Sequence, residues 1–154
     1  MRKVLKALLM IVILWIIFYF SSQNATESIA SSNSIVDTFT NIFERFKDAN
    51  IPLIDNLLKN VNTVDVYNFL RNNVRRAAHI IEFFVLYIAI YELLKEFDVK
   101  KAIILTLIIC LGFAIFDELH QMFVIGRTCQ FTDVLIDTAG IILASLFWHY
   151  IIKR

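Results

Sequence analysis

Residues 102–140 decide the fold, and they read AIILTLIICLGFAIFDELHQMFVIGRTCQFTDVLIDTAG. An uncharged apolar run over 102–116 leads directly into a polar stretch, and a second apolar run begins at residue 134. Each Arg, Lys or Asp at mid-membrane raises the free energy of insertion by about 2.5–3.5 kcal/mol. The chain must therefore pair these polar side chains or use them. They are Asp117, Glu118, His120, Gln121, Arg127, Asp133 and Asp137.

The overall composition predicts a membrane protein. The chain has 154 residues, of which 58% are hydrophobic, with three glycines and one proline. Soluble domains contain about 45–50% apolar residues. The formal net charge of +1 gives no reason to expect a nucleic-acid partner. We expect no disulfide, because Cys110 lies in mid-span and Cys129 lies in a short loop.

Four apolar segments have the length of roughly 20 residues that a bilayer-crossing helix needs. They cover residues 4–20, 77–94, 102–120 and 134–152. Since backbone groups in lipid must be hydrogen-bonded internally, we expect these segments to be helices. The predicted fold is an all-α integral membrane bundle, a single domain over 1–154. We interpret its first segment as a retained anchor rather than a cleaved signal peptide.

The distribution of basic residues predicts the orientation, because cytoplasmic ends of spans are enriched in Lys and Arg. Basic residues precede the first span, occupy the short loop between the second and third spans, and follow the last span. They are Arg2, Lys3, Lys6, Lys95, Lys100, Lys101, Lys153 and Arg154. We therefore expect a multi-pass protein of the cell membrane with both termini in the cytoplasm. The segment 21–73 and the loop 122–130 then lie on the extracytoplasmic side.

The outer segment 21–73 is predicted to contain short helices. Apolar residues between Ile35 and Phe46 fall on one helical face, with Ser34 as a candidate N-cap. Residues 53–60 follow a proline and can form a second helix. A third helix, residues 64–71 after a Thr63 cap, is expected to run directly into the second span.

Polar residues recur at helical spacing where three spans approach the outer side. Residues three or four positions apart share one helix face. One such face per span comprises, in turn, Arg75, His79 and Glu82, then Asp117 and Gln121, then Asp133, Asp137 and Gly140. Ionisable residues within a membrane usually face the bundle interior and mark a site. The competing interpretation is a polar network that only fastens the helices.

Three chemistries suit this outward-facing polar site. Arg75, Arg76 and Arg127 suit recognition of a phosphate or carboxylate. Histidine with carboxylates also suits acid–base chemistry or proton relay. The candidates for such roles are His79, Glu82, Asp117 and Glu118. The same four residues with Asp137 could hold a divalent metal, but this donor set selects no particular ion, so the sequence identifies no cofactor.

The ordered motifs of the chain resemble the VanZ-like family. The matching residues are Phe20, Ser21, Ser22 and Gln23, then Arg75 to His79 with Glu82, then Asp117, Glu118 and Gln121, then Arg127, Asp133 and Gly140. The chain differs from the common pattern at Phe83, Ile125 and Asp137, where the family has Tyr, Pro and Asn. The resemblance covers nearly the whole chain and implies a small bacterial polytopic membrane protein.

The resemblance also implies a role in resistance to teicoplanin, a lipid-bearing glycopeptide. The favoured hypothesis is a non-enzymatic envelope protein that binds a lipid-linked cell-wall precursor, another anionic headgroup, or the drug. Its predicted partners are membrane lipids. One alternative is an intramembrane enzyme that modifies a lipid or precursor headgroup. The other is a proton-coupled transporter or flippase, which would require a homo-oligomer because four spans provide few helices for a path.

Overall fold

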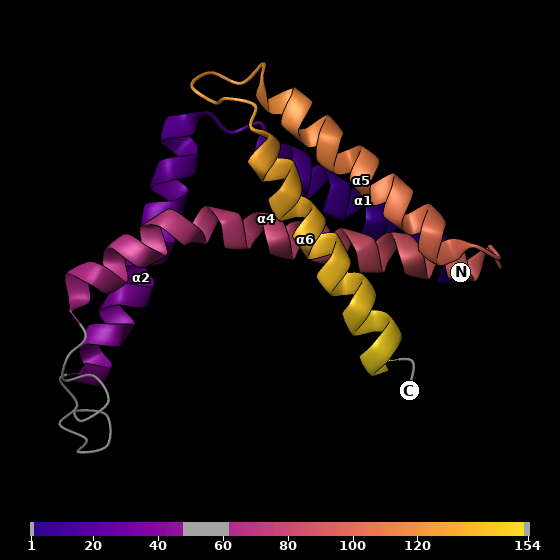
Figure 1. Cartoon of the computed structure of the whole chain (residues 1–154), viewed down its shortest axis with the longest axis horizontal. Coiled ribbons are helices and arrows are strands. Elements are labelled where there is room, and N and C mark those ends of the chain that lie inside the picture. Colours follow the sequence, from indigo (N-terminus) through magenta and orange to yellow (C-terminus); the bar gives the residue numbers. More distant parts are fainter. Residues whose placement is uncertain (1, 48–61, 153–154) are drawn as a thin grey trace. The chain divides into compact units, whose positions relative to one another are not determined.

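The computed structural model describes residues 2–47 and 62–152, in which every regular element is a helix. The elements are α1 (Arg2–Ser21), α2 (Ala25–Lys47), α4 (Thr63–Glu96), α5 (Ala102–Gln121), α6 (Phe131–Phe147) and a final π-helical turn, η1 (Trp148–Ile152). Figure 1 shows their order along the chain. The predicted all-α fold class is therefore confirmed.

Four helices are long and apolar enough to cross a membrane. They cover Arg2–Ser21, Asn73–Glu96, Ala102–Gln121 and Phe131–Tyr150. The predicted spans agree with these to within a few residues at each end. The second span begins at Asn73 rather than at residue 77, because it continues a helix that has already begun at Thr63.

The chain forms two compact units, which are described separately. One comprises residues 1–25 and 78–154, and the other comprises residues 26–77. The first unit contains α1, most of the membrane-spanning part of α4, α5 and α6. We call it the bundle unit. The prediction of a single domain over 1–154 stays a prediction.

In the second unit, α2 begins earlier than the sequence pattern indicated. It starts at Ala25, so Ser34 is not an N-cap but an interior residue whose carbonyl accepts a hydrogen bond from Thr38 at 2.9 Å. Asn62, rather than Thr63, caps α4, because its side chain accepts the Val64 N–H at 3.0 Å. The predicted continuation of helix 64–71 into the second span is confirmed. The predicted helix 53–60 lies outside the described residues.

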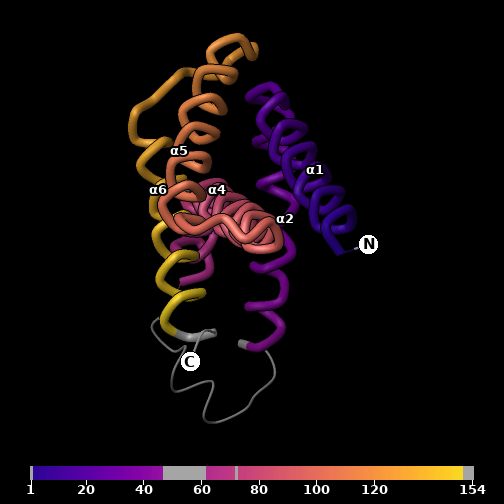
Figure 2. Tube along the Cα trace, turned by 90° about the vertical axis from the view of Figure 1, so that its right-hand side faces the viewer, coloured from indigo at the N-terminus to yellow at the C-terminus, as the bar shows by residue number. Residues whose placement is uncertain are grey.

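The core of the bundle unit is built on one stripe of α4. Phe83, Leu86, Tyr87 and Ile90 follow the helical spacing and are almost fully buried. Small residues of α5 and α6 allow close approach to this stripe. The buried small residues are Ala102, Cys110, Ala114 and Ala144. Figure 2 shows α5 and α6 following one another on the same side of the bundle unit.

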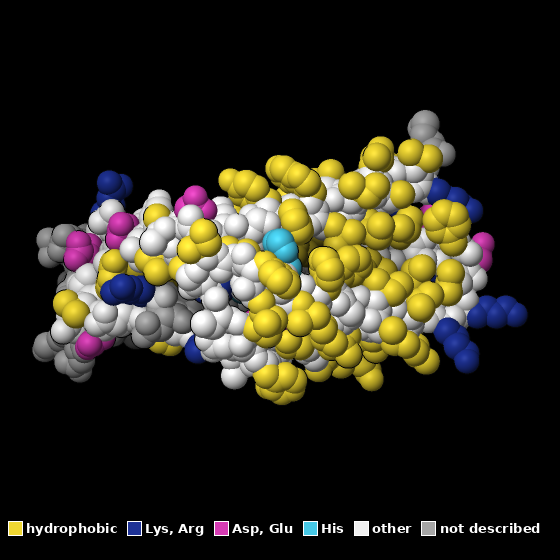
Figure 3. Space-filling model, turned by 90° about the horizontal axis from the view of Figure 1, so that it is seen from above, with side chains coloured by type: hydrophobic (Ala, Val, Ile, Leu, Met, Phe, Trp, Pro, Cys, Tyr) yellow, Lys and Arg dark blue, Asp and Glu magenta, His cyan; other side chains and the backbone are white. Residues whose placement is uncertain are grey.

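Large apolar side chains also cover the outside of the membrane helices. Leu8, Ile108 and Leu143 are examples from α1, α5 and α6, and each is at least half exposed. Figure 3 shows hydrophobic side chains spread over much of the face in view. An apolar exterior over a helical bundle is the arrangement that lipid tails solvate, which agrees with the composition.

Charges at one end of the bundle unit are paired. Lys6 Nζ lies 3.0 Å from carboxylate oxygens of both Glu92 and Glu96, so the start of α1 is joined to the end of α4. Lys3 lies over the ring of Phe97 at 4.9 Å. All three members of the Lys6 ion pairs are partly exposed. We call them the Lys6 cluster.

Candidate functional site

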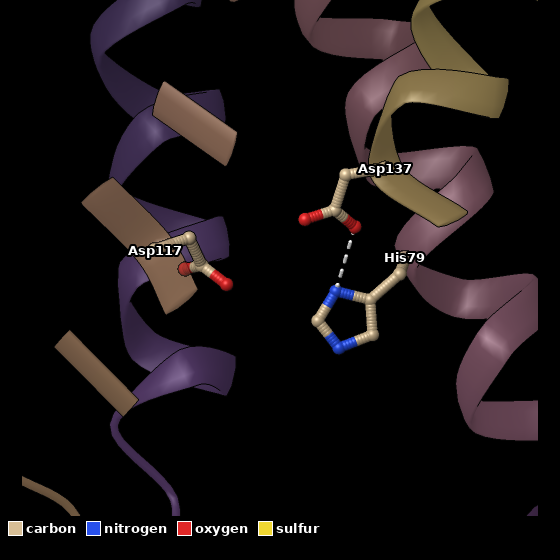
Figure 4. Close-up of side chains that lie close together, drawn as sticks. All are labelled: His79, Asp117 and Asp137. Carbon is tan, nitrogen blue, oxygen red and sulfur yellow. Dashed lines mark ion pairs between the residues drawn. The ribbon is translucent and has the colours of Figure 1, made fainter. Parts of the chain in front are cut away.

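Three membrane helices each deliver one ionisable side chain to a common point. His79 comes from α4, Asp117 from α5 and Asp137 from α6, and one ligand atom of each lies within 4.8 Å of the other two. Figure 4 shows the imidazole and the two carboxylates facing the same space between the helices. We call these three residues the His–Asp cluster. The predicted convergence of polar faces from three spans is thus present for one residue of each.

The His–Asp cluster is buried and incompletely bonded. His79 Nδ1 lies 3.2 Å from Asp137 Oδ1, but neither atom has a partner in hydrogen-bond geometry. Asp137 Oδ2 also has no hydrogen bond, although the side chain is only 1% exposed. A buried carboxylate without hydrogen bonds carries a desolvation penalty of several kcal/mol. The arrangement is therefore poorly suited to a purely structural role.

A close helix crossing brings His79 and Asp137 together. Gly140 lies one turn beyond Asp137 on α6 and packs against the backbone of Ile80, the neighbour of His79 on α4. A Cβ atom at Gly140 would lie 3.1 Å from both Cα and C of Ile80, and closer still to its carbonyl oxygen. Only a residue without a Cβ permits this approach. By contrast, a Cβ at Gly112 would meet no atom within 4 Å.

Asp117 is oriented by a chain of side-chain hydrogen bonds. Gln121 Nε2 donates to Asp117 Oδ2 at 2.7 Å, and Arg127 Nη1 donates to Gln121 Oε1 at 3.0 Å. Arg127 Nη2 also donates to the carbonyl of Phe20 at 3.2 Å. The guanidinium thereby joins the loop after α5 to the end of α1. Three predicted site residues, Asp117, Gln121 and Arg127, form one connected unit.

The end of α1 is fixed by further contacts with α5. Ser22 Oγ and His120 Nε2 are hydrogen-bonded at 3.1 Å, and the rings of Phe18 and His120 stack at 4.7 Å. Ala25 N donates to Ile125 O at 3.3 Å. His120 therefore has a structural partner in the Ser22 segment. These contacts explain why polar residues follow the first span immediately.

An apolar cavity opens beside the His–Asp cluster, and the sequence analysis did not predict it. Its volume is about 180 Å³. Its walls come from α1, α4 and α5, and its polar groups belong to Asp117 and His120. The lining residues are Leu14, Ile17, Phe18, Leu86, Phe113, Phe116, Asp117 and His120. No sequence signal could have identified this cavity, since its walls are ordinary apolar residues of three different helices.

The remaining predicted site residues have different positions. The Glu118 carboxylate accepts the backbone N–H of Gln130, just before α6, so it fastens the loop rather than joining the cluster. Glu82 is partly buried one turn along α4 from His79. Asp133 is partly buried one turn before Asp137. Arg75 and Arg76 belong to the second unit, so their membership of the site stays a prediction.

The charge balance at this end of the bundle unit is acidic. Within this unit, the carboxylates of Glu82, Asp117, Glu118, Asp133 and Asp137 share their neighbourhood with one guanidinium, that of Arg127. Excess negative charge in a poorly solvated site favours a bound cation or proton. The arrangement can bind a cation, hold a proton on the imidazole, or place Arg127 against an anionic ligand.

Another polar group at the far end of α6 has complete hydrogen bonds. Tyr87 OH donates to Ser145 Oγ at 3.2 Å and lies 3.1 Å from His149 Nε2. The rings of Tyr91 and His149 meet edge-on at 4.9 Å. His149 packs against α4 through the rings of Tyr87 and Tyr91. Its polar neighbours are satisfied, which is what a helix-fastening role requires.

Comparison with known proteins identifies one relationship. The protein-family model described as VanZ/LLP1 matches residues 6–153, which is nearly the whole chain and includes both units. No curated protein matches the chain. No solved structure matches it either.

Proposed function

The chain belongs to the VanZ/LLP1 family, and on that premise we propose that it is a cell-envelope protein that lowers susceptibility to lipoglycopeptides such as teicoplanin. It does so by binding a lipid-linked or other anionic headgroup at the His–Asp cluster. The proposal requires no covalent chemistry. Its partners are membrane lipids and a lipid-linked cell-wall precursor or the drug itself.

The cavity beside the His–Asp cluster is the observation that carries the proposal. Its walls are apolar along α1 and α5, whereas Asp117 and His120 form its polar end. A ligand that matches both parts has an alkyl chain joined to a polar headgroup. Pockets that combine an apolar lining with a few convergent polar groups are typical ligand sites. A membrane amphiphile meets this requirement better than a water-soluble ligand does.

Arg127 provides the positive charge for an anionic headgroup. It is partly buried, and it is the guanidinium already joined through Gln121 to Asp117. Arginine recognises phosphate and carboxylate groups through several donors at once. In the proposal Glu82, Asp133 and Glu118 border the site.

The proposed orientation places the loop 122–130 outside the cell, where Cys129 provides a direct test. Cys129 is exposed and Cys110 is buried. Local desolvation and the Glu118 carboxylate raise the pKa of the Cys129 thiol, so labelling should be slow at pH 7 and faster at higher pH. A membrane-impermeant maleimide added to intact cells at about pH 8.5 should label wild type but not Cys129→Ser. Labelling only after the cells are lysed would contradict the orientation.

The functional test is teicoplanin susceptibility of a sensitive host that expresses the chain. We expect wild type to reduce susceptibility, and His79→Ala, Asp117→Ala and Arg127→Ala each to lose that effect at matched membrane levels. Asp98→Asn is the control, because Asp98 lies in the exposed loop before α5 and asparagine tolerates its positive φ of 55°. Unchanged susceptibility with wild type, or full protection by all three variants, would contradict the proposal.

A further inference from the structure

We propose that His79, Asp117 and Asp137 bind one divalent first-row transition-metal ion, with Zn²⁺ and Mn²⁺ as the best-suited ions. The inference deepens the proposed function and rests on it for the role of the site. It names a cofactor for the His–Asp cluster that the sequence did not identify.

The donor atoms select this class of metal. One imidazole nitrogen and two carboxylate oxygens form a mixed nitrogen and oxygen set. Magnesium and calcium prefer oxygen ligands alone, whereas zinc, manganese and iron accept imidazole with carboxylate. Three protein ligands also leave coordination positions open, as in catalytic zinc sites rather than closed structural ones.

The spacing of the His79 and Asp137 donor atoms is also that of two ligands of one metal ion. Two ligands at about 2.1 Å from one ion, at tetrahedral or octahedral angles, lie about 3.0–3.4 Å apart. His79 Nδ1 and Asp137 Oδ1 are 3.2 Å apart but lack hydrogen-bond geometry. One carboxylate oxygen of Asp117 lies within 4.8 Å of a ligand atom of each of the other two residues.

The unsatisfied atoms of Asp137 are a second, independent indication of a ligand. Both carboxylate oxygens are buried without a hydrogen bond, and the side chain is 1% exposed and directed into the cluster. A divalent cation would supply the missing partner. It would also neutralise the two aspartates, which reduces the electrostatic penalty of burying them among apolar helices.

The surroundings position two of the ligands in advance. Gln121 holds one oxygen of Asp117 and is itself held by Arg127. Such outer partners orient metal ligands and tune their affinity. The contact of Gly140 with Ile80 fixes the distance between the helices that carry Asp137 and His79. The ligands therefore come from elements whose relative placement is constrained by close packing.

A bound cation would also account for anion binding at an acidic site. Its open coordination positions can accept a phosphate or carboxylate oxygen of a headgroup, next to the Asp117 end of the cavity. The carboxylates around it would then face a cation rather than the anionic ligand. The acidic residues would then serve to bind the cation. Headgroup recognition by Arg127 alone gives them no such role.

The test measures metal binding by the purified full chain in detergent. After treatment with a chelator and dialysis, the protein is titrated with Zn²⁺ and Mn²⁺, and with Co²⁺ for its visible spectrum. We expect about one ion per chain and, for Asp137→Asn and His79→Ala, affinity reduced at least roughly tenfold. Asp98→Asn and His149→Ala are the matched controls, because their side chains lie outside the cluster.

Wild type supplies a test that needs no substitution. A Co²⁺ spectrum with bands of nitrogen and oxygen ligation, abolished by added Zn²⁺, would support the site even if a variant failed to fold. Folded wild type that binds none of the three ions, or Asp137→Asn that binds as tightly as Asp98→Asn, would overturn the inference. Susceptibility that still depends on Asp117 and Arg127 without metal binding would leave the proposed function standing.

Discussion

The two ends of the bundle unit handle charge in opposite ways. In the Lys6 cluster, one ammonium group meets two carboxylates at 3.0 Å, and all three side chains remain partly in contact with solvent. In the His–Asp cluster, two buried aspartates share one imidazole, and Asp137 has no hydrogen bond to either oxygen. The first arrangement joins α1 to α4. The second leaves buried carboxylate oxygens without hydrogen bonds.

This difference distinguishes a fastening contact from a binding site. Exposed ion pairs contribute little free energy of folding and also cost little to form. Buried carboxylates without hydrogen bonds destabilise the folded chain, so they persist where another requirement retains them. The completed hydrogen bonds among Tyr87, Ser145 and His149 show that the same helices can satisfy buried polar groups. Buried polar atoms without hydrogen bonds occur instead at the opposite end of the bundle unit, where they include both oxygens of Asp137 and Oε2 of Glu118.

The largest effect on folding stability is expected for Gly140→Ala. The added Cβ would collide with the Ile80 backbone and force α4 and α6 apart. Overpacking of this kind typically destabilises by about 1–3 kcal/mol. Because the same crossing sets the His79 to Asp137 distance, protection against teicoplanin should fall as well. Thermal unfolding in detergent measures the first effect.

Gly112→Ala is the matched control for this prediction, since its new Cβ meets no atom within 4 Å. It should leave the unfolding temperature unchanged or raise it slightly, because alanine has the higher helix propensity. If Gly140→Ala and Gly112→Ala had the same unfolding temperature and gave the same protection, the close helix crossing at Gly140 would not be required for the site.

An intermediate effect is expected for Arg127→Met. The substitution removes the hydrogen bonds to Gln121 and to the Phe20 carbonyl, and both partners lose a charged donor. We expect a loss of about 1–2 kcal/mol in folding stability and a clear loss of protection. Arg127→Met should reduce folding stability less in a Gln121→Leu background than in wild type, because the hydrogen bond between the two residues is already absent there. A double-mutant cycle measures this difference. Strict additivity would contradict the proposed connection.

The smallest effect is expected for Lys6→Met. The Lys6 cluster is partly exposed, so its removal should shift the unfolding temperature less than Gly140→Ala does and leave protection unchanged. Methionine keeps an apolar stem of similar length. Teicoplanin susceptibility with Lys6→Met is the relevant measurement, and a loss equal to that of His79→Ala would remove the contrast between the two clusters.

Much of the fold was predictable because length and hydropathy determine membrane helices directly. The four spans and the fusion of helix 64–71 with the second span were read from apolar runs and turn residues. The start of α2 was missed, because its polar first turns lack the apolar periodicity that marks the Ile35 to Phe46 face. A local pattern cannot show where a polar helix begins.

The site was predictable as a set of residues but not as a geometry. Helical spacing placed His79, Asp117 and Asp137 on polar faces, but equally placed Glu82 and Asp133 there. Which of these residues meet depends on how the helices cross. In the sequence, Gly140 is one more small residue and gives no sign that α4 and α6 cross there. Glu118 accepts a hydrogen bond from the Gln130 backbone. This contact depends on the conformation of the loop between α5 and α6, which the sequence pattern does not show. The cavity depends on three helices together and has no local signal.

The most direct test of the central claim compares folding stability and Zn²⁺ affinity in one variant, Asp137→Asn. It removes the buried charge while keeping the shape of the side chain. If the His–Asp cluster is a working site, metal-free Asp137→Asn should unfold at the same temperature as wild type or higher, and its affinity for Zn²⁺ should be at least roughly tenfold lower. A less stable protein that binds Zn²⁺ as tightly as wild type would show that Asp137 only fastens the helices, and would contradict this account.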